Sequence, residues 1–66
     1  MTFIVYTIDN CEHCDKLLSK MRENGYVYEE VNVSKNPIAK EWLIQREYPI
    51  PVVFVNGKVV EVFKEN

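Results

Sequence analysis

The chain has 66 residues, of which 47% are hydrophobic and 27% charged, and its formal net charge is −2. A chain of this length forms one domain, residues 1–66, and is too short for a cleft between two lobes. The acidic balance argues against nucleic acid as a partner, because phosphate binding needs a basic face. No apolar run approaches the roughly 20 residues that span a bilayer, and the N-terminus lacks a signal-peptide pattern. We therefore expect a cytoplasmic protein without a membrane partner.

The first half of the chain predicts a buried strand followed by a helix. Residues 2–8 are rich in β-branched and aromatic residues with apolar side chains on both faces, as in a central strand. Asp9 or Asn10 can cap a helix that opens at Cys11, and the Asn-Gly pair at 24–25 ends it. The apolar residues of this helix recur at helical spacing and predict one buried stripe: Cys14, Leu17, Leu18 and Met21.

The second half predicts a strand, a helix and a hairpin. Residues 27–33 form the second expected strand, and Asn36 with Pro37 begins a helix that runs to about Glu47. We expect its apolar residues to face the core: Ile38, Ala39, Trp42 and Leu43. Two further strands, 52–55 and 58–63, flank an Asn-Gly pair, which is the strongest short hairpin signal. The predicted order is β-α-β-α-β-β.

Cys11 and Cys14 form a C-x-x-C pair at the start of the first predicted helix. Closing so short a loop stabilises a fold by only about 2 kcal/mol, so the pair is better suited to chemistry than to reinforcement. Beside a strand-helix-strand pattern, this motif is typical of thioredoxin-like redox proteins. Free N–H groups at the helix start stabilise a thiolate on Cys11. Cys14, one turn along, can attack a mixed disulfide on Cys11. We therefore predict that Cys11 is the nucleophile and Cys14 the resolving thiol.

Other interpretations of the cysteines remain open at this point. A zinc site needs four ligands, whereas this segment offers Cys11, Cys14 and at most His13, so we expect no metal unless two chains share one. Haem attachment needs a histidine directly after the second cysteine, and Asp15 stands there. The two thiols could also be incidental. His13 is most simply explained as a solvated surface side chain.

Taken together, the motifs resemble those of the glutaredoxins over almost the whole chain. The shared features are the C-x-x-C at a helix start, the segment VNVSKNP at 31–37 and the segment IPVVFVNGKVV at 50–60. The resemblance implies an α/β, thioredoxin-like fold with a four-stranded mixed sheet, helices on both faces and the family's third helix absent. It also implies a cis peptide bond between Ile50 and Pro51 beside Cys11. Ile50 and Pro51 then bind substrate, the Ile50 backbone pairing with the substrate as a short added strand.

The chain departs from the family pattern in three places. A basic residue commonly precedes the family's first cysteine, whereas Thr7, Ile8, Asp9 and Asn10 stand here. Glu12 and His13 stand where the family usually has proline and an aromatic residue, and the charge of Glu12 opposes thiolate formation. The glycine and acidic pair that opens the family's third helix and holds glutathione has no counterpart. We therefore expect Val60 or Val62 to be covered by Phe63, by a dimer partner or by a client protein.

These features predict a small cytoplasmic dithiol-disulfide oxidoreductase that reduces protein disulfides or glutathione mixed disulfides. The resemblance suggests ribonucleotide reductase as one acceptor of its electrons. We expect no tightly bound cofactor, with glutathione or a flavoprotein reductase as the electron source. The expected partners are disulfide-containing client proteins and glutathione, and the protein itself is a monomer or a weak dimer. The alternative is a non-catalytic redoxin-fold module that docks a partner through its uncovered sheet face or edge, and thiol reactivity distinguishes the two.

Overall fold

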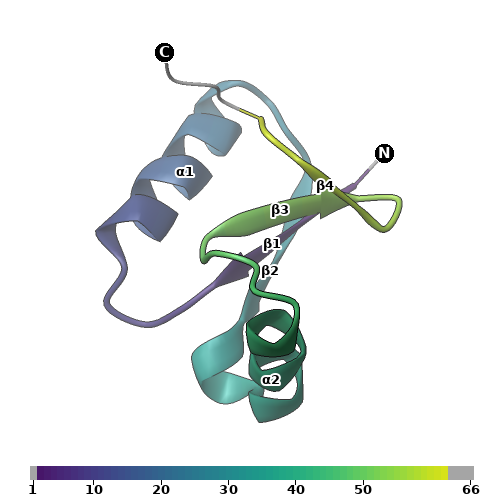
Figure 1. Ribbon diagram of the computed structural model, residues 1–66. Coiled ribbons are helices and arrows are strands. Elements are labelled where there is room, and N and C mark those ends of the chain that lie inside the picture. Colours follow the sequence, from purple (N-terminus) through teal and green to yellow (C-terminus); the bar gives the residue numbers. More distant parts are fainter. Residues whose placement is uncertain (1, 63–66) are drawn as a thin grey trace.

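The computed structural model describes residues 2–62, which form four strands and two α-helices (Figure 1). The elements are, in chain order, β1 (Phe3–Thr7), α1 (Glu12–Glu23), β2 (Tyr28–Asn32), the 3₁₀ turn η1 (Val33–Lys35), α2 (Pro37–Gln45), β3 (Val52–Val55) and β4 (Lys58–Val60). The predicted order β-α-β-α-β-β is confirmed. Within residues 2–62, α1 and α2 are the only α-helices.

The four strands form one mixed sheet in the order β2-β1-β3-β4. β1 runs parallel to β2, with Phe3 opposite Tyr28 and Thr7 opposite Asn32. β3 is antiparallel to β1, and β4 is antiparallel to β3. The central position of β1 and β3 agrees with their apolar sequences, because a central strand covered on both faces buries side chains in both directions.

The two helices cover opposite faces of the sheet (Figure 1), and the buried apolar residues of the range 2–62 form one small hydrophobic cluster on each face. On the α1 side the buried residues are Val5, Leu18, Met21 and Val53. On the α2 side they are Val33, Leu43, Val52 and Phe54. Neighbouring residues of β3 thus enter different clusters, as the alternation of side chains along a strand requires. The predicted placement of helices on both faces is confirmed.

The start of α1 differs from the prediction. Its N-cap is Cys11, not Asp9 or Asn10, and the Cys11 sulfur accepts the hydrogen bond of the cap. Asn10 has a φ of 56°, so it turns the chain immediately before the cap. At the other end, Asn24 is the C-cap and Gly25 has a φ of 75°, which confirms the predicted stop. The predicted stripe packs inward, although Leu17 is only partly buried.

The start of α2 agrees with the prediction, but its apolar face does not. Asn36 is the N-cap, its side-chain oxygen accepts a 3.1 Å hydrogen bond from the Ala39 N–H, and Pro37 is the first helical residue. Ala39 and Leu43, four residues apart, face the sheet. Ile38 lies about 100° around the helix from Ala39 and is 83% exposed. Its predicted place in the core was therefore wrong.

Trp42 was also expected in the core and instead lies at its rim, 37% exposed. Its ring centroid is 5.8 Å from that of Phe54 and 5.9 Å from that of Tyr48, and the Arg46 guanidinium lies 4.4 Å above it. The indole thus contacts aromatic residues of the α2 side and a cation, and 37% of the residue remains exposed to solvent. The helix itself ends at Gln45, earlier than predicted, because Glu47 adopts a φ of 58° that a right-handed helix does not contain.

The predicted hairpin is present. Asn56 and Gly57 have φ values of 51° and 77°, the left-handed conformations that a tight two-residue turn requires. β4 is shorter than the predicted strand and ends at Val60. Phe63, one of the residues expected to cover the sheet face, lies outside the described residues.

Candidate functional site

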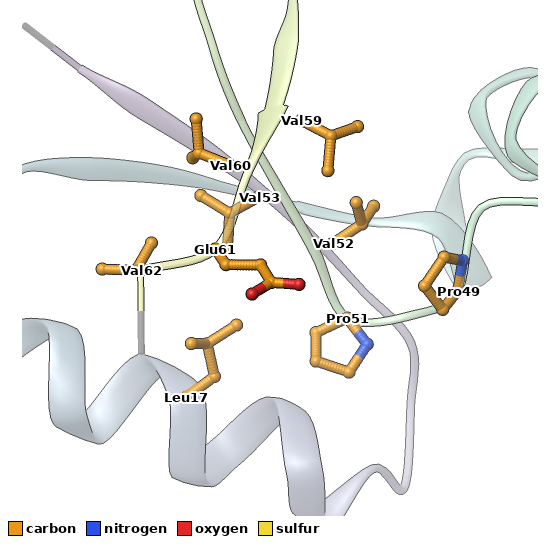
Figure 2. Close-up of a pocket in the computed structure, with 9 residues that line it drawn as sticks. All are labelled: Leu17, Pro49, Pro51, Val52, Val53, Val59, Val60, Glu61 and Val62. Carbon is orange, nitrogen blue, oxygen red and sulfur yellow. The ribbon is translucent and has the colours of Figure 1, made fainter. Parts of the chain in front are cut away.

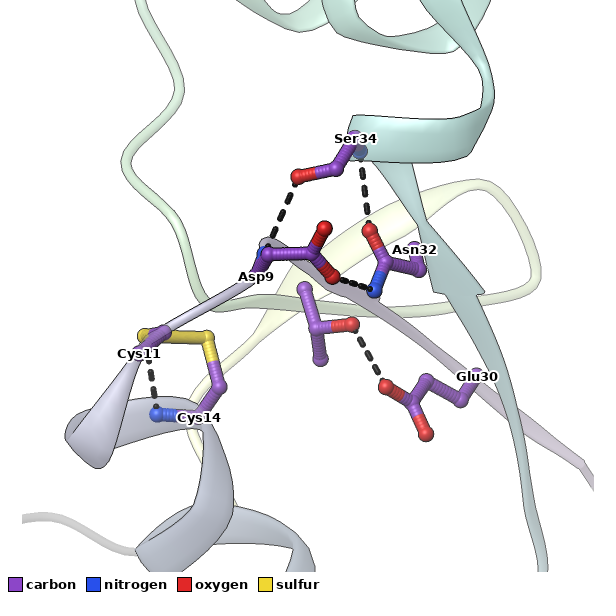
Figure 3. The surroundings of a disulfide bond; sticks show 7 residues. Asp9, Cys11, Cys14, Glu30, Asn32 and Ser34 are labelled. Atoms are coloured by element: carbon purple, nitrogen blue, oxygen red, sulfur yellow. Dashed lines mark hydrogen bonds between the residues drawn. A yellow bond between two sulfur atoms is a disulfide. The ribbon is translucent and has the colours of Figure 1, made fainter.

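Cys11 and Cys14 form a disulfide at the start of α1, with their Cα atoms 5.3 Å apart (Figure 3). Cys11 is partly exposed, whereas Cys14 is buried with 2% of its surface accessible. The Cys14 backbone N–H donates a 3.1 Å hydrogen bond to the Cys11 sulfur. One sulfur therefore faces outward at the helix start and the other faces the core, in agreement with the positions expected from helical spacing.

Three hydrogen bonds hold the loop that precedes Cys11. The Asp9 backbone N–H donates to the Ser34 hydroxyl at 3.0 Å, and the Asn32 side-chain amide donates to the Asp9 carboxylate at 2.7 Å. The Ser34 backbone N–H in turn donates to the Asn32 side-chain oxygen at 2.8 Å. This network links the β1–α1 loop to the end of β2 and the start of η1 (Figure 3). Sequence analysis missed it, because its partners are far apart in the chain.

A buried threonine lies at the end of β1, four residues before Cys11. Thr7 is 2% exposed, and its hydroxyl donates a 2.7 Å hydrogen bond to the Glu30 carboxylate of β2. Figure 3 labels Glu30 among the residues around the disulfide. Burying an unpartnered hydroxyl is unfavourable, and this bond removes that cost. Within residues 2–62, every buried side-chain nitrogen or oxygen has a hydrogen-bond partner. A polar residue at the end of an otherwise apolar strand was the only sequence signal of this contact.

The charged residues of α1 follow its dipole. Glu12 and Asp15 lie in the first turn, and Lys20 and Arg22 in the last. Two carboxylates therefore stand close to the cysteine pair, where they favour the helix but disfavour additional negative charge on sulfur. His13, between the cysteines, is exposed as predicted. Among residues 2–62 no three side chains of the metal-binding types cluster, and no helix in that range is long and apolar enough to cross a membrane.

Ile50 and Pro51 precede β3, and the peptide bond between them is cis, as the resemblance implied. The antiparallel register pairs Tyr6 with Val52, so Pro51 lies at the end of the sheet from which β1 leads to Cys11. The Ile50 side chain packs against the α2-side cluster. Pro51 lines a pocket of about 260 Å³ between α1 and the last two strands (Figure 2).

Comparisons with known proteins agree with this arrangement. A model of the glutaredoxin family matches residues 3–60, a range that includes both cysteines and Pro51. The crystal structure of the thioredoxin-like protein BC3987 is similar, with a TM-score of 0.75, 31% sequence identity and coverage of 94% of this chain and 88% of that chain. A threonine-to-alanine mutant of that protein matches with a TM-score of 0.75, 30% identity and coverage of 94% and 86%.

No curated protein matches the chain. The family match and the thioredoxin-like neighbours support a redox role, and the disulfide between Cys11 and Cys14 is consistent with it. On its sequence match, its fold and the position of its cysteine pair, this chain belongs to the glutaredoxin family.

Proposed function

We propose that the protein is a thiol-disulfide oxidoreductase that reduces client disulfides through Cys11 and Cys14. The observation that supports this most directly is the asymmetry of the pair: one sulfur is partly exposed at a helix start and the other is buried one turn along. An exposed thiolate can reach a large client, and a buried neighbour is protected from reacting with that client itself.

The reaction proceeds in two exchanges. The Cys11 thiolate attacks one sulfur of the client disulfide, forms a mixed disulfide and releases the other client sulfur as a thiolate, which takes up a proton. Cys14 then loses its proton and attacks the Cys11 sulfur, which releases the second client thiol and closes the disulfide between Cys11 and Cys14. Counting the proton that Cys11 gives to solvent when it ionises, the client gains two electrons and two protons and the protein loses them.

The start of α1 supports the first exchange. The N–H groups of the first turn have no partner within the helix, and the Cys14 N–H donates directly to the Cys11 sulfur at 3.1 Å. Such donors stabilise negative charge on sulfur and so increase the fraction of thiolate at neutral pH. The carboxylates of Glu12 and Asp15 act in the opposite direction. The reactivity of Cys11 reflects the balance of these two effects.

Substrate binding in this proposal uses the segment before β3. The backbone of Ile50 pairs with the client as a short added strand, and Pro51 lies beside the reacting sulfur.

The proposed location of the protein is the cytoplasm, and its clients include protein disulfides and glutathione mixed disulfides, with ribonucleotide reductase as one electron acceptor. Glutathione or a flavoprotein reductase returns the electrons to the Cys11–Cys14 disulfide. These assignments follow from the family resemblance.

A redox titration tests the proposal. The protein is equilibrated in a graded glutathione buffer, quenched by alkylation and analysed by mass. We expect both cysteines to convert together, with a midpoint between about −200 and −290 mV, a window that includes the potentials of glutaredoxins and thioredoxin. The Cys14→Ser variant is the matched control and cannot form the internal disulfide. A wild-type pair that stays reduced throughout, or a single reacting cysteine, would contradict a dithiol mechanism.

A non-catalytic binding module is the second candidate. The pocket between α1 and the last two strands favours it, since apolar side chains there are accessible within residues 2–62. A docking module needs no reactive thiol, so it would bind its partner equally well with both cysteines replaced by serine. The titration above therefore decides between the two candidates.

A further inference from the structure

The pocket beside Pro51 has apolar walls and one charged residue. Its lining includes Leu17 of α1, Val53 of β3, Val60 of β4 and Val62, together with Pro51 and Glu61. Figure 2 shows the Glu61 carboxylate between Leu17 and Pro51, directed into the space between them. Glu61 is exposed and makes no hydrogen bond or ion pair with another residue of the range 2–62. Within residues 2–62, the pocket therefore combines apolar walls with a carboxylate that no described residue pairs.

The size of the pocket indicates what it can hold. Pockets that enclose a whole small molecule have volumes of roughly 300–1,000 Å³, and this one is smaller, at about 260 Å³. It is suited to one aliphatic side chain of a larger partner. Its polar groups are also too few to orient a free ligand, because Glu61 is the only charged residue among the described residues that line it.

Two residues that line the pocket belong to elements of the proposed redox site. Leu17 is three residues after Cys14 on the same stripe of α1, which is about 4.5 Å further along the helix axis. Pro51, on the other wall, belongs to the segment proposed to bind the client backbone. A client held at Pro51 with its sulfur at Cys11 thus has neighbouring side chains within reach of the pocket.

Charge argues for a client and against a second copy of this chain. A carboxylate in an apolar pocket favours a partner with a cation close to its apolar side chain. The chain itself has a formal net charge of −2, so long-range repulsion between like charges disfavours the approach of a second copy to Glu61. We propose that this pocket selects client proteins whose reacting cysteine is flanked by an aliphatic and a basic residue, the aliphatic side chain entering the pocket and the basic one pairing with Glu61. This inference rests on the proposed function.

Four symmetric peptide disulfides test the inference. On each side of its cysteine, every peptide carries one uncharged residue, either leucine or serine, and one charged residue, either lysine or glutamate. The two choices give four peptides. The reduced full-length protein reacts with each disulfide, and alkylation followed by mass analysis gives the rate. Each rate is divided by the rate of dithiothreitol with the same peptide, which removes the intrinsic reactivity of that disulfide. The dimers are symmetric, so attack on either sulfur gives the same products.

We expect leucine to increase the normalised rate about five-fold over serine, as burial of roughly half of a leucine side chain implies. We expect lysine to increase it about two- to five-fold over glutamate, the size of an exposed ion pair, and salt to reduce this preference. In Glu61→Gln the lysine preference falls toward one while the leucine preference remains. Glu29→Gln, which removes an exposed carboxylate from β2, is the matched control and retains both preferences.

The possible failures are distinguishable. If no peptide is reduced faster than by dithiothreitol, both the proposed function and this inference fail. If all four are reduced at the same normalised rate, the oxidoreductase stands and the pocket has no role in selection. If the preferences arise only in Phe63→Ser, the chain's own C-terminal segment occupies the pocket, and the inference is wrong. If they disappear as the protein is diluted, the site belongs to a dimer and the inference is again wrong.

Discussion

The backbone N–H of Asp9 donates a 3.0 Å hydrogen bond to the hydroxyl of Ser34, 25 residues further along the chain. Asp9 lies two residues before Cys11, and Ser34 belongs to the 3₁₀ turn after β2. Because β1 and β2 are parallel, their ends meet at the same edge of the sheet, and this bond ties the loop that leads to the redox pair to the neighbouring crossover. The position of Cys11 thus depends on Ser34, whose hydrogen bonds within residues 2–62 go to Asp9 and Asn32 and not to either sulfur.

This relationship predicts that Ser34→Ala loosens the loop before Cys11. Loss of the acceptor should cost about 0.5–1.5 kcal/mol of unfolding free energy, the usual contribution of one hydrogen bond. Amide hydrogen exchange at Asp9 should become faster, because its N–H loses its partner. Ser34→Thr keeps a hydroxyl and should stay close to wild type. Unchanged exchange at Asp9 in Ser34→Ala would show that this bond does not hold the loop.

The burial of the two cysteines predicts opposite behaviour of their serine variants. Cys14→Ser should accumulate a stable mixed disulfide with a peptide or glutathione disulfide, because no resolving thiol remains to release it. Cys11→Ser should form almost none, because the remaining sulfur is only 2% exposed. Mass spectrometry of the non-reduced proteins measures both. Equal adduct formation by the two variants would contradict the assignment of Cys11 as the nucleophile.

Glu12 is predicted to have opposite effects on helix stability and thiol reactivity. Glu12→Gln removes a negative charge from the first turn, which should cost about 0.3–1 kcal/mol of helix stabilisation. The same change should increase the thiolate fraction of Cys11 and therefore its alkylation rate at pH 7 in the reduced protein. Urea denaturation and iodoacetamide kinetics measure the two effects separately. Glu23→Gln, at the last residue of α1, is the matched control and should leave the alkylation rate unchanged.

The adjacent residues Leu43 and Ile44 should differ sharply in their contribution to stability. Leu43 is fully buried in the α2-side cluster, so Leu43→Ala should cost about 2–5 kcal/mol, whereas Ile44 is 56% exposed and Ile44→Ala should cost about 0.5 kcal/mol or less. Urea denaturation of the oxidised proteins measures both. Because a loss of this size can unfold so small a domain, Leu43→Met serves as a milder variant, expected to cost less than about 1.5 kcal/mol. Similar losses for Leu43→Ala and Ile44→Ala would overturn the assigned orientation of α2.

The hairpin turn predicts a backbone effect without a steric one. Gly57 has a φ of 77°, and a Cβ atom built there meets nothing within 4 Å. Gly57→Ala should therefore destabilise the fold by about 1 kcal/mol, solely because an L-residue disfavours this conformation. Asn56→Gly at the other turn position, where φ is 51°, should change stability by less than about 0.5 kcal/mol. Thermal denaturation distinguishes the two, and equal losses would exclude the conformational explanation.

The order of the elements could be predicted from the sequence because each signal for it is local. Proline after Asn36, glycine after Asn24 and the Asn-Gly pair of the hairpin each restrict backbone angles within a few residues. The spacing of Cys14, Leu18 and Met21 predicted the buried side of α1 in the same way. The position of the C-x-x-C pair at the start of α1 was likewise predicted from local sequence signals.

The remaining features were decided by the tertiary structure. Ile38 is apolar, yet it is exposed because Ala39 and Leu43 face the sheet and Ile38 lies about 100° around the helix from Ala39. The bonds from Thr7 to Glu30 and from Asp9 to Ser34 join residues more than 20 positions apart, so no local pattern could pair them. The pocket with Glu61 likewise forms only where α1, the Pro51 segment and β4 converge. Local backbone preferences thus determined the elements of this protein, whereas their packing, which depends on contacts between distant residues, determined what surrounds the cysteine pair.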